Sequence, residues 1–354
     1  MSREIQAPNE RAKEQLFGFQ QGSSSRQEKN TRLYWDHRWR NLSPCYWKIF
    51  FQKSNYRYFY KTKYLYQQHR LRKNNELKQR NLEERFKSKE IVDLKLTIIE
   101  GMRNADALRE TNAWEQIIVP AMKNHTLVTF VFTIAENQKN KPIAQNSQPK
   151  TDPFSPPFEP GRFITDLSST HRLIANKYPI VKNHVLIVTS VFQEQTDPLN
   201  LDDFVSSYKV LLALNGILYF NSGPCSGASQ PHKHLQVMPK FQEDSSGILT
   251  LIDKEAIRHD KPFKWHVFQF AHWIVPLPNF SQTDSDKEIG AKLEKLYLKL
   301  INKLKINTKV DSYNLIMNEN WMMIVKRSKE YAFEGVSVNA LGFMGNSIFY
   351  EWRV

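Results

Sequence analysis

Two histidines and a glutamine alternate with other residues in the segment PHKHLQVM, as His232, His234 and Gln236. This alternation is typical of a strand, on which successive side chains point to opposite faces. The three polar side chains would then form one row, about 7 Å apart at successive steps. Leu235 and Val237 would point the other way, toward a core.

A loop of small residues, SGPCSGASQ, directly precedes this row. Gly223 and Gly227 allow backbone N–H groups to approach a ligand closely. Successive N–H groups, together with the hydroxyls of Ser226 and Ser229, can form a concave anion-binding site. The order of the two features predicts a row of histidines beside a phosphate-binding loop.

This arrangement suits chemistry at phosphorus. Neutral imidazole is a good nucleophile near pH 7, because its ordinary pKa is about 6.5. Attack of such an imidazole on phosphorus would give a phosphoramidate and divide one difficult displacement into two easier ones. The loop would stabilise charge that develops in the transition state, and the Gln236 amide would hold the reacting group.

Two other interpretations of the histidines stay open. A His-x-His pair on a strand also suits Zn²⁺, with Cys225 as a third ligand. The two histidines could instead be ordinary surface residues. A Walker-type phosphate loop is excluded, because no Gly-Lys-Ser/Thr follows the glycines.

Residues 221–236 closely resemble the motif of ATP adenylyltransferases, also called diadenosine tetraphosphate phosphorylases. These enzymes are a branch of the histidine-triad superfamily, alongside galactose-1-phosphate uridylyltransferase. The resemblance covers residues 88–354, although residues 88–127 match only loosely. It extends through DPFSPP at 152–157, NKYP at 176–179, HVLIVT at 184–189, YNLIM at 313–317, WM at 321–322 and VNALGF at 338–343.

The resemblance implies cleavage of diadenosine tetraphosphate by phosphate to give ATP and ADP, and the reverse reaction. His234 would be the nucleophile that becomes adenylylated, with His232 and Gln236 as the other catalytic residues. Gln236 stands where simpler triad proteins carry a third histidine, a replacement that goes with transfer to phosphate rather than to water. A related transferase that uses another nucleotide or adenylyl sulfate is the alternative.

The same resemblance implies which residues bind the nucleotide. Asn221 would bind it or shape the loop. The residues expected at the phosphates are Ser226, Gly227, Ala228, Ser229 and Gln230. The remaining predicted site residues are Asn176, Lys177, Lys139, Asn318 and Lys326.

The elements that must position these residues indicate an α+β fold, a histidine-triad-like antiparallel sheet flanked by helices. The motif strand should lie inside the sheet, with the loop at its head. Periodicity predicts helices over 90–110, 200–217 and 285–306, and a solvated helix over 67–90. Predicted strands cover 128–134, 171–177, 184–189, 219–221, 232–238, 313–317 and 321–325, and residues 139–160 are predicted to be a linker. Residues 88–245 would form the catalytic region, and 246–354 would complete the nucleotide pocket.

Charge sets the first 87 residues apart. They hold 20 Lys and Arg against 8 Asp and Glu, and so carry most of the net charge of +14. Basic and aromatic residues interleave there, as in segments that bind nucleic acid. We expect a partly disordered extension, which either binds nucleic acid or has no role in the chemistry.

The composition limits which cofactors and which cellular location we expect for the protein. Two cysteines argue against a disulfide framework and favour a reducing compartment. No apolar run approaches the ~20 residues of a membrane span, and the N-terminus lacks the apolar core of a secretory signal. We therefore expect a cytoplasmic protein with nucleotides as partners and no membrane partner. Mg²⁺ is expected only as a companion of the polyphosphate, with no metal ligands from the chain.

Overall fold

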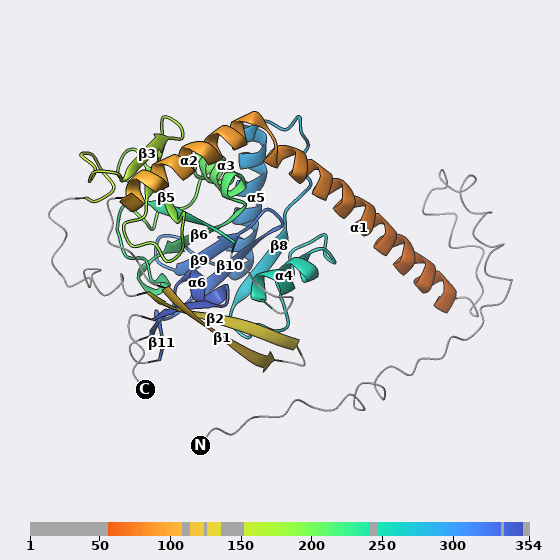
Figure 1. The fold of residues 1–354 in the computed structure, drawn as a ribbon. Coiled ribbons are helices and arrows are strands. Elements are labelled where there is room, and N and C mark those ends of the chain that lie inside the picture. Colours follow the sequence, from red (N-terminus) through yellow and green to blue (C-terminus); the bar gives the residue numbers. More distant parts are fainter. Residues whose placement is uncertain are drawn as a thin grey trace, which may run out of the picture. The chain divides into compact units, whose positions relative to one another are not determined.

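An antiparallel sheet of eight strands forms the centre of the computed structural model (Figure 1), in the order β3-β4-β5-β7-β6-β9-β10-β8. The structure describes residues 56–107, 114–123, 126–135, 152–240, 247–333 and 336–349. Residues 66–354 form one compact unit, and the account below concerns that unit. The expected boundary at residues 245/246 lies outside the described residues.

The sheet combines strands from both expected regions of the body. Its strands are β3 (Phe163–Asp166), β4 (His171–Ala175), β5 (Val185–Thr189), β6 (Gly216–Ser222), β7 (His234–Pro239), β8 (His272–Pro276), β9 (Ser312–Met317) and β10 (Trp321–Arg327). Strand β6 joins the two regions, because it pairs with β7 on one side and with β9 on the other. The motif strand β7 thus lies inside the sheet, as predicted, between β5 and β6.

Three helices cover one face of the sheet, α2 (Lys89–Ala107), α3 (Leu201–Leu214) and α5 (Asp286–Leu304) (Figure 1). Capping boxes start two of them. Asn200 and Asp203 form the one on α3, and Ser285 and Glu288 form the one on α5. The core on this face includes Leu235 and Val237 of the motif strand, both fully buried.

The other face of the sheet carries a second core around Tyr219, Met238 and Trp321. Helices α4 (Ile248–Ala256) and α6 (Ala340–Phe343) contribute to it. A smaller sheet of β1 (Trp114–Lys123), β2 (Thr126–Ala135) and β13 (Asn346–Phe349) contacts these two helices, and β11 (Tyr331–Phe333) pairs with β12 (Val336–Ser337). His234 and Gln236 alternate with the residues of the helix-covered core, so they lie on this second face.

Helix α1 (Tyr56–Phe86) differs from the solvated helix that the sequence predicts for residues 67–90. Leu82 is buried in the main core. The Lys78 ammonium donates to the carbonyls of Leu277 and Asn320, at 2.9 and 3.0 Å. Asn81 donates to Asn279 Oδ1 at 3.0 Å. The last turns of α1 are therefore part of the folded body.

Most of the predicted elements are present with shifted ends, among them the helices and strands on both sides of the motif. The predicted strand 232–238 begins only at His234, because His232 makes a single isolated bridge to Glu194. The predicted linker is partly wrong. Residues 139–151 lie outside the described residues, but residues 152–160 fold back against the motif histidines instead of spanning two regions. The extension before Tyr56, with its predicted disorder and nucleic-acid binding, also lies outside the described residues.

Candidate active site

His234 stands at the start of β7, where the small-residue loop enters the sheet. Its ring Nδ1 lies 2.8 Å from the backbone oxygen of His232. A carbonyl oxygen only accepts hydrogen bonds, so Nδ1 carries the proton and the lone pair of the neutral ring is on Nε2. The Phe154 ring packs against the imidazole, with centroids 4.9 Å apart, and His234 is 4% exposed. The site therefore holds His234 in one orientation and in the nucleophilic tautomer.

His232 is buried, and both of its ring nitrogens contact acceptors. Nδ1 lies 2.6 Å from Asp152 Oδ2. Nε2 lies 2.9 Å from the backbone oxygen of Thr189 and 2.9 Å from its hydroxyl. The ring is thus anchored on two sides, and it serves His234 through its backbone carbonyl.

Gln236 belongs to a buried network of polar side chains. Its Oε1 accepts from the Tyr219 hydroxyl at 2.9 Å and lies 3.0 Å from His184 Nε2. Asn176 Nδ2 contacts the same His184 ring at 3.1 Å, so Asn176 reaches the motif through His184. Burial raises the pKa of Tyr219 far above its ordinary value, and its hydroxyl stays a donor. With Oε1 engaged in this way, the Gln236 amide presents its NH₂ as the donor group.

Lys233, between the two histidines, points to the opposite face of the sheet. Its ammonium lies 2.6 Å from Asp203 Oδ2 at the start of α3, and both side chains are fully buried. His171 Nε2 lies 3.0 Å from the other Asp203 oxygen. Burial alone would raise the pKa of Asp203, but the contacts with His171 and Lys233 lower it. This ion pair ties the motif to the helical layer.

The loop ahead of β7 is held by its own contacts. Gly223 and Gly227 have φ of +83° and +75°, a region that favours glycine. The Ser226 hydroxyl donates to the Gly223 carbonyl at 2.6 Å, so this buried side chain shapes the loop. Asn221 Oδ1 accepts from Asn314 Nδ2 at 2.7 Å and from the Ala340 N–H at 3.1 Å. Of the two roles predicted for Asn221, these contacts match the shaping of the loop.

Gln195 is a site residue that the sequence does not reveal. Its Oε1 accepts from the His234 N–H at 2.8 Å, and its Nε2 donates to the Asn221 carbonyl at 2.8 Å. The two ends of the loop are therefore clamped by one buried carboxamide. No motif surrounds Gln195, and only the fold brings it to His234.

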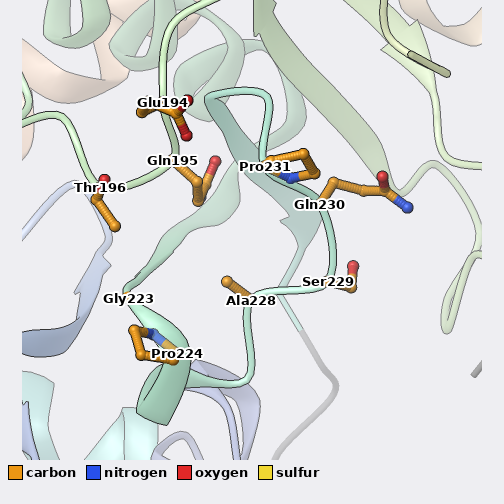
Figure 2. Close-up of a pocket in the computed structure, with 9 residues that line it drawn as sticks. All are labelled: Glu194, Gln195, Thr196, Gly223, Pro224, Ala228, Ser229, Gln230 and Pro231. Carbon is orange, nitrogen blue, oxygen red and sulfur yellow. The ribbon is translucent and has the colours of Figure 1, made fainter. Parts of the chain in front are cut away.

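A cavity of about 330 Å³ lies between the 194–196 segment and the loop. Figure 2 shows Ala228, Ser229 and Gln230 on one wall and Gln195 on the other. The Gln230 Oε1 atom is buried and makes no hydrogen bond within the described residues. Three of the predicted phosphate-contacting residues thus line a cavity, while the His234 ring is not part of its lining.

Other predicted residues lie away from the histidines. Lys177 forms an exposed ion pair with Glu159 at 2.7 Å. Asn318 donates to Asp253 at 2.9 Å, at the end of β9 that is remote from the loop. Lys326 pairs with Asp311 at 2.9 Å, on the helix-covered face of the sheet. Contact of Asn318 and Lys326 with the nucleotide stays a prediction, and Lys139 lies outside the described residues.

The contacts of His232 do not favour the interpretation of the two histidines as zinc ligands. Both nitrogens of His232 are engaged by Asp152 and Thr189. Within the described ranges, no group of three or more His, Cys, Asp or Glu side chains is arranged to hold a metal ion.

In the same ranges, no helix has the length and apolarity needed to cross a membrane.

Comparisons with known proteins agree on both halves of the body. Residues 85–252 match the Ap4A phosphorylase N-terminal domain, and residues 266–351 match the ATP adenylyltransferase C-terminal domain. The diadenosine 5',5'''-P1,P4-tetraphosphate phosphorylase 2 of Saccharomyces cerevisiae is 30% identical over 259 residues, 62% of this chain and 76% of that protein. Protein APA1 of the same yeast is 29% identical over 236 residues, 58% of this chain and 70% of that protein.

The fold is similar to that of yeast Ap4A phosphorylase Apa2. The crystal structure of Apa2 in complex with AMP aligns with a TM-score of 0.60 and 24% identity, over 75% of this chain and 89% of that chain. The structure of the same protein in complex with Ap4A aligns equally well, over 73% and 90%. Helix α1 lies almost entirely before the residues that the family models match.

Proposed function

The chain belongs to the Ap4A phosphorylase family, and from this premise we propose that it transfers AMP through a covalent intermediate on His234. The overall reaction is phosphorolysis of diadenosine tetraphosphate (Ap4A) to ATP and ADP, and its reverse. The observation that carries the proposal is the 2.8 Å contact between His234 Nδ1 and the His232 carbonyl. It places the lone pair on Nε2, where a nucleophile needs it.

The first step forms one bond and breaks one. Nε2 of His234 attacks the phosphorus next to an adenosine, and the bond from that phosphorus to the bridging oxygen breaks. ATP leaves, and AMP stays on the ring as a phosphoramidate. The adenylylated ring carries positive charge, which the hydrogen bond from Nδ1 to the His232 carbonyl stabilises.

The second step reverses the geometry of the first. An oxygen of inorganic phosphate attacks the same phosphorus, the N–P bond breaks, and ADP forms. The ring returns to its neutral state, with the lone pair again on Nε2. Because His234 is the nucleophile of the first step and the leaving group of the second, all the ADP is formed from the adenylylated protein.

The groups around the nucleophile have separate roles in this reaction. The Gln236 NH₂ is directed by Tyr219 and His184, and it would donate to a non-bridging oxygen of the transferred group. The cavity beside Ala228, Ser229 and Gln230 would receive the remaining phosphates. Donors of this kind stabilise charge without reorganising during the reaction.

Two accompanying features belong to the same proposal. The polyphosphate would enter with Mg²⁺ on its own oxygens, because this ion keeps most of its water and is commonly held by substrate phosphates. The enzyme would act in the cytoplasm, as the small number of cysteines favours. Titrating the reaction with EDTA tests the first feature, and imaging the tagged protein in its own cell tests the second.

The direct test is phosphorolysis of Ap4A by the wild-type protein and by His234→Ala, with identification of the products. We expect ATP and ADP in equal amounts from the wild type and none above background from the variant. The same assay with guanosine and uridine dinucleotides measures the base preference. Release of AMP in place of ADP, or turnover by the variant at the wild-type rate, would refute the proposal.

A further inference from the structure

We propose that Asp152 is a positioning residue for the nucleophile: it holds His232 as an imidazolium and so fixes the carbonyl that orients His234. The proposal rests on the function proposed above. It concerns the segment DPFSPP, which the sequence predicts to be part of a linker and which instead forms one wall of the site.

The first argument is the protonation of His232. Its Nδ1 faces a carboxylate oxygen at 2.6 Å, and its Nε2 faces the Thr189 carbonyl at 2.9 Å. Carboxylate and carbonyl oxygens only accept hydrogen bonds, and the Thr189 hydroxyl, 2.9 Å from Nε2, can also accept, so the doubly protonated ring has a partner for each of its two protons. A ring that donates from both nitrogens is positively charged.

The second argument is the charge of Asp152. Burial of this carboxyl works to raise its pKa, but hydrogen bonds from the Ser155 hydroxyl, the Phe154 N–H and His232 outweigh burial, and the pKa lies below its ordinary value. Asp152 is therefore a carboxylate at neutral pH. A buried cation with an anion at 2.6 Å is a matched pair, whereas a buried cation alone would be costly.

The surroundings of His232 provide few competing charges. Thr189 closes one edge of the ring, and the Phe154 and Phe192 rings lie 6.0 and 5.2 Å from it. Glu194 is another carboxylate close in the fold, since its backbone bridges to that of His232. The Glu194 side chain is exposed, and the direct ion pair is with Asp152.

The third argument connects Asp152 to the nucleophile by two routes. Through His232, it holds the ring whose carbonyl accepts from His234 Nδ1. Through its own turn, its Oδ1 accepts from the Phe154 N–H at 2.9 Å, and the Phe154 ring then packs on His234. One carboxylate thus organises both the acceptor and the wall that fix the reactive ring.

A spectroscopic experiment tests the protonation without any turnover. Nitrogen-15 NMR of histidine-labelled protein near pH 7.5 should show both His232 nitrogens protonated, with the signal assigned by its loss in His232→Asn. In Asp152→Asn, the new amide can donate to Nδ1, so the ring should become neutral with its proton on Nε2. A neutral His232 in the wild-type protein would overturn the proposal.

Kinetics test the positioning. Asp152→Asn keeps the size of the side chain, and we expect kcat for phosphorolysis to fall by about tenfold to a hundredfold with little change in KM, the size of effect that a small misplacement produces. The matched control is Asp203→Asn, which breaks the buried ion pair on the other face of the same motif. It should lower thermal stability but leave His232 doubly protonated.

The outcomes separate this proposal from the proposed function. Wild-type kcat in a folded Asp152→Asn protein would contradict the positioning role. If the variant does not fold, the spectrum of the wild type still decides the protonation of His232. Absence of phosphorolysis by the wild-type protein would contradict the proposed function, and the spectrum would still uphold or overturn the imidazolium.

Discussion

The side-chain oxygen of Gln236 accepts a hydrogen bond from the hydroxyl of Tyr219, over 2.9 Å. Tyr219 lies on β6 and Gln236 on β7, and the two residues are direct partners across the sheet. The contact turns the NH₂ end of the Gln236 amide away from the tyrosine. A residue that sequence analysis assigns only to a predicted strand thus determines what the motif glutamine presents to a ligand.

Replacing Tyr219 by Phe should therefore reduce transfer without removing the nucleophile. The amide keeps its contact with His184 but loses one of two restraints, so we expect kcat to fall about fivefold, as for one neutral hydrogen bond of about 1 kcal/mol. Steady-state phosphorolysis measures the change. Tyr297→Phe is the matched control, because its buried hydroxyl bonds Tyr313 among the helix-covered core residues. Equal loss of kcat in both variants would contradict a specific role for Tyr219.

A methyl group on Gly227 should damage the loop. The residue has φ of +75°, and a Cβ there would lie 2.9 Å from the Asn339 Cβ. We expect Gly227→Ala to destabilise the protein by about 1–3 kcal/mol and to weaken nucleotide binding. Denaturant unfolding and calorimetric titration measure the two effects. Gly161→Ala, at φ +73° outside the loop, should reduce stability but leave binding intact. Unchanged nucleotide binding by Gly227→Ala would argue against a role of the loop backbone.

Stability should fall in acid partly through His272. Its Nε2 accepts from the Trp265 N–H at 2.9 Å, so the folded ring is neutral. Burial lowers the pKa of His272 below its ordinary value, against the opposing hydrogen bond with Phe270. The unfolded chain therefore binds this proton first. The stabilisation that the neutral His272 ring provides is complete above about pH 6.5. It is lost as the pH falls below that value, by at most about 1.4 kcal/mol of unfolding free energy per pH unit.

The replacement His272→Gln tests whether His272 causes this loss of stability in acid, because glutamine can make both hydrogen bonds without titrating. Unfolding free energies are compared from about pH 7 to about pH 5. The variant should lose less stability over this range than the wild-type protein. Parallel curves for the two proteins would show that His272 does not titrate between the folded and unfolded states.

The last turns of α1 should contribute to stability. A deletion of residues 1–65 leaves the contacts of Lys78, Asn81 and Leu82, whereas a deletion of residues 1–87 removes them. We expect the longer deletion to be less stable by several kcal/mol, about 1 for each lost hydrogen bond and about 2 for Leu82. Thermal and denaturant unfolding compare the two proteins. Equal stability would mean that α1 does not belong to the folded body.

The sequence predicts the parts of the site that are local in the chain. Alternation in PHKHLQVM identifies the faces of β7, and the small residues before it identify the loop. Sequence analysis does not identify contacts between residues that lie far apart along the chain. Gln195 lies 39 residues before His234, and Asp152 lies 80 before His232, so only the folded sheet brings them together.

The places of Lys326 and Asn318 in the fold show a related limit of sequence analysis. Lys326 shares the alternation of Met322 and Ile324, which are turned to the helix-covered core, so its side chain lies on the face of the sheet opposite to His234 and Gln236. Asn318 lies at the far end of β9 from the loop. In both cases the sequence predicts the strand. It does not predict on which face of the sheet, or at which end of the strand, the side chain lies.

The central claim is that AMP is bound covalently to His234, and trapping that adduct tests it most directly. The protein is mixed with nucleotide labelled at the phosphorus next to adenosine, then denatured, digested and mapped. We predict label on the peptide that carries His234 in the wild type, and no label in a folded His234→Ala variant that still binds nucleotide. Label on a different residue, or turnover with no labelled protein in the wild type, would contradict the account.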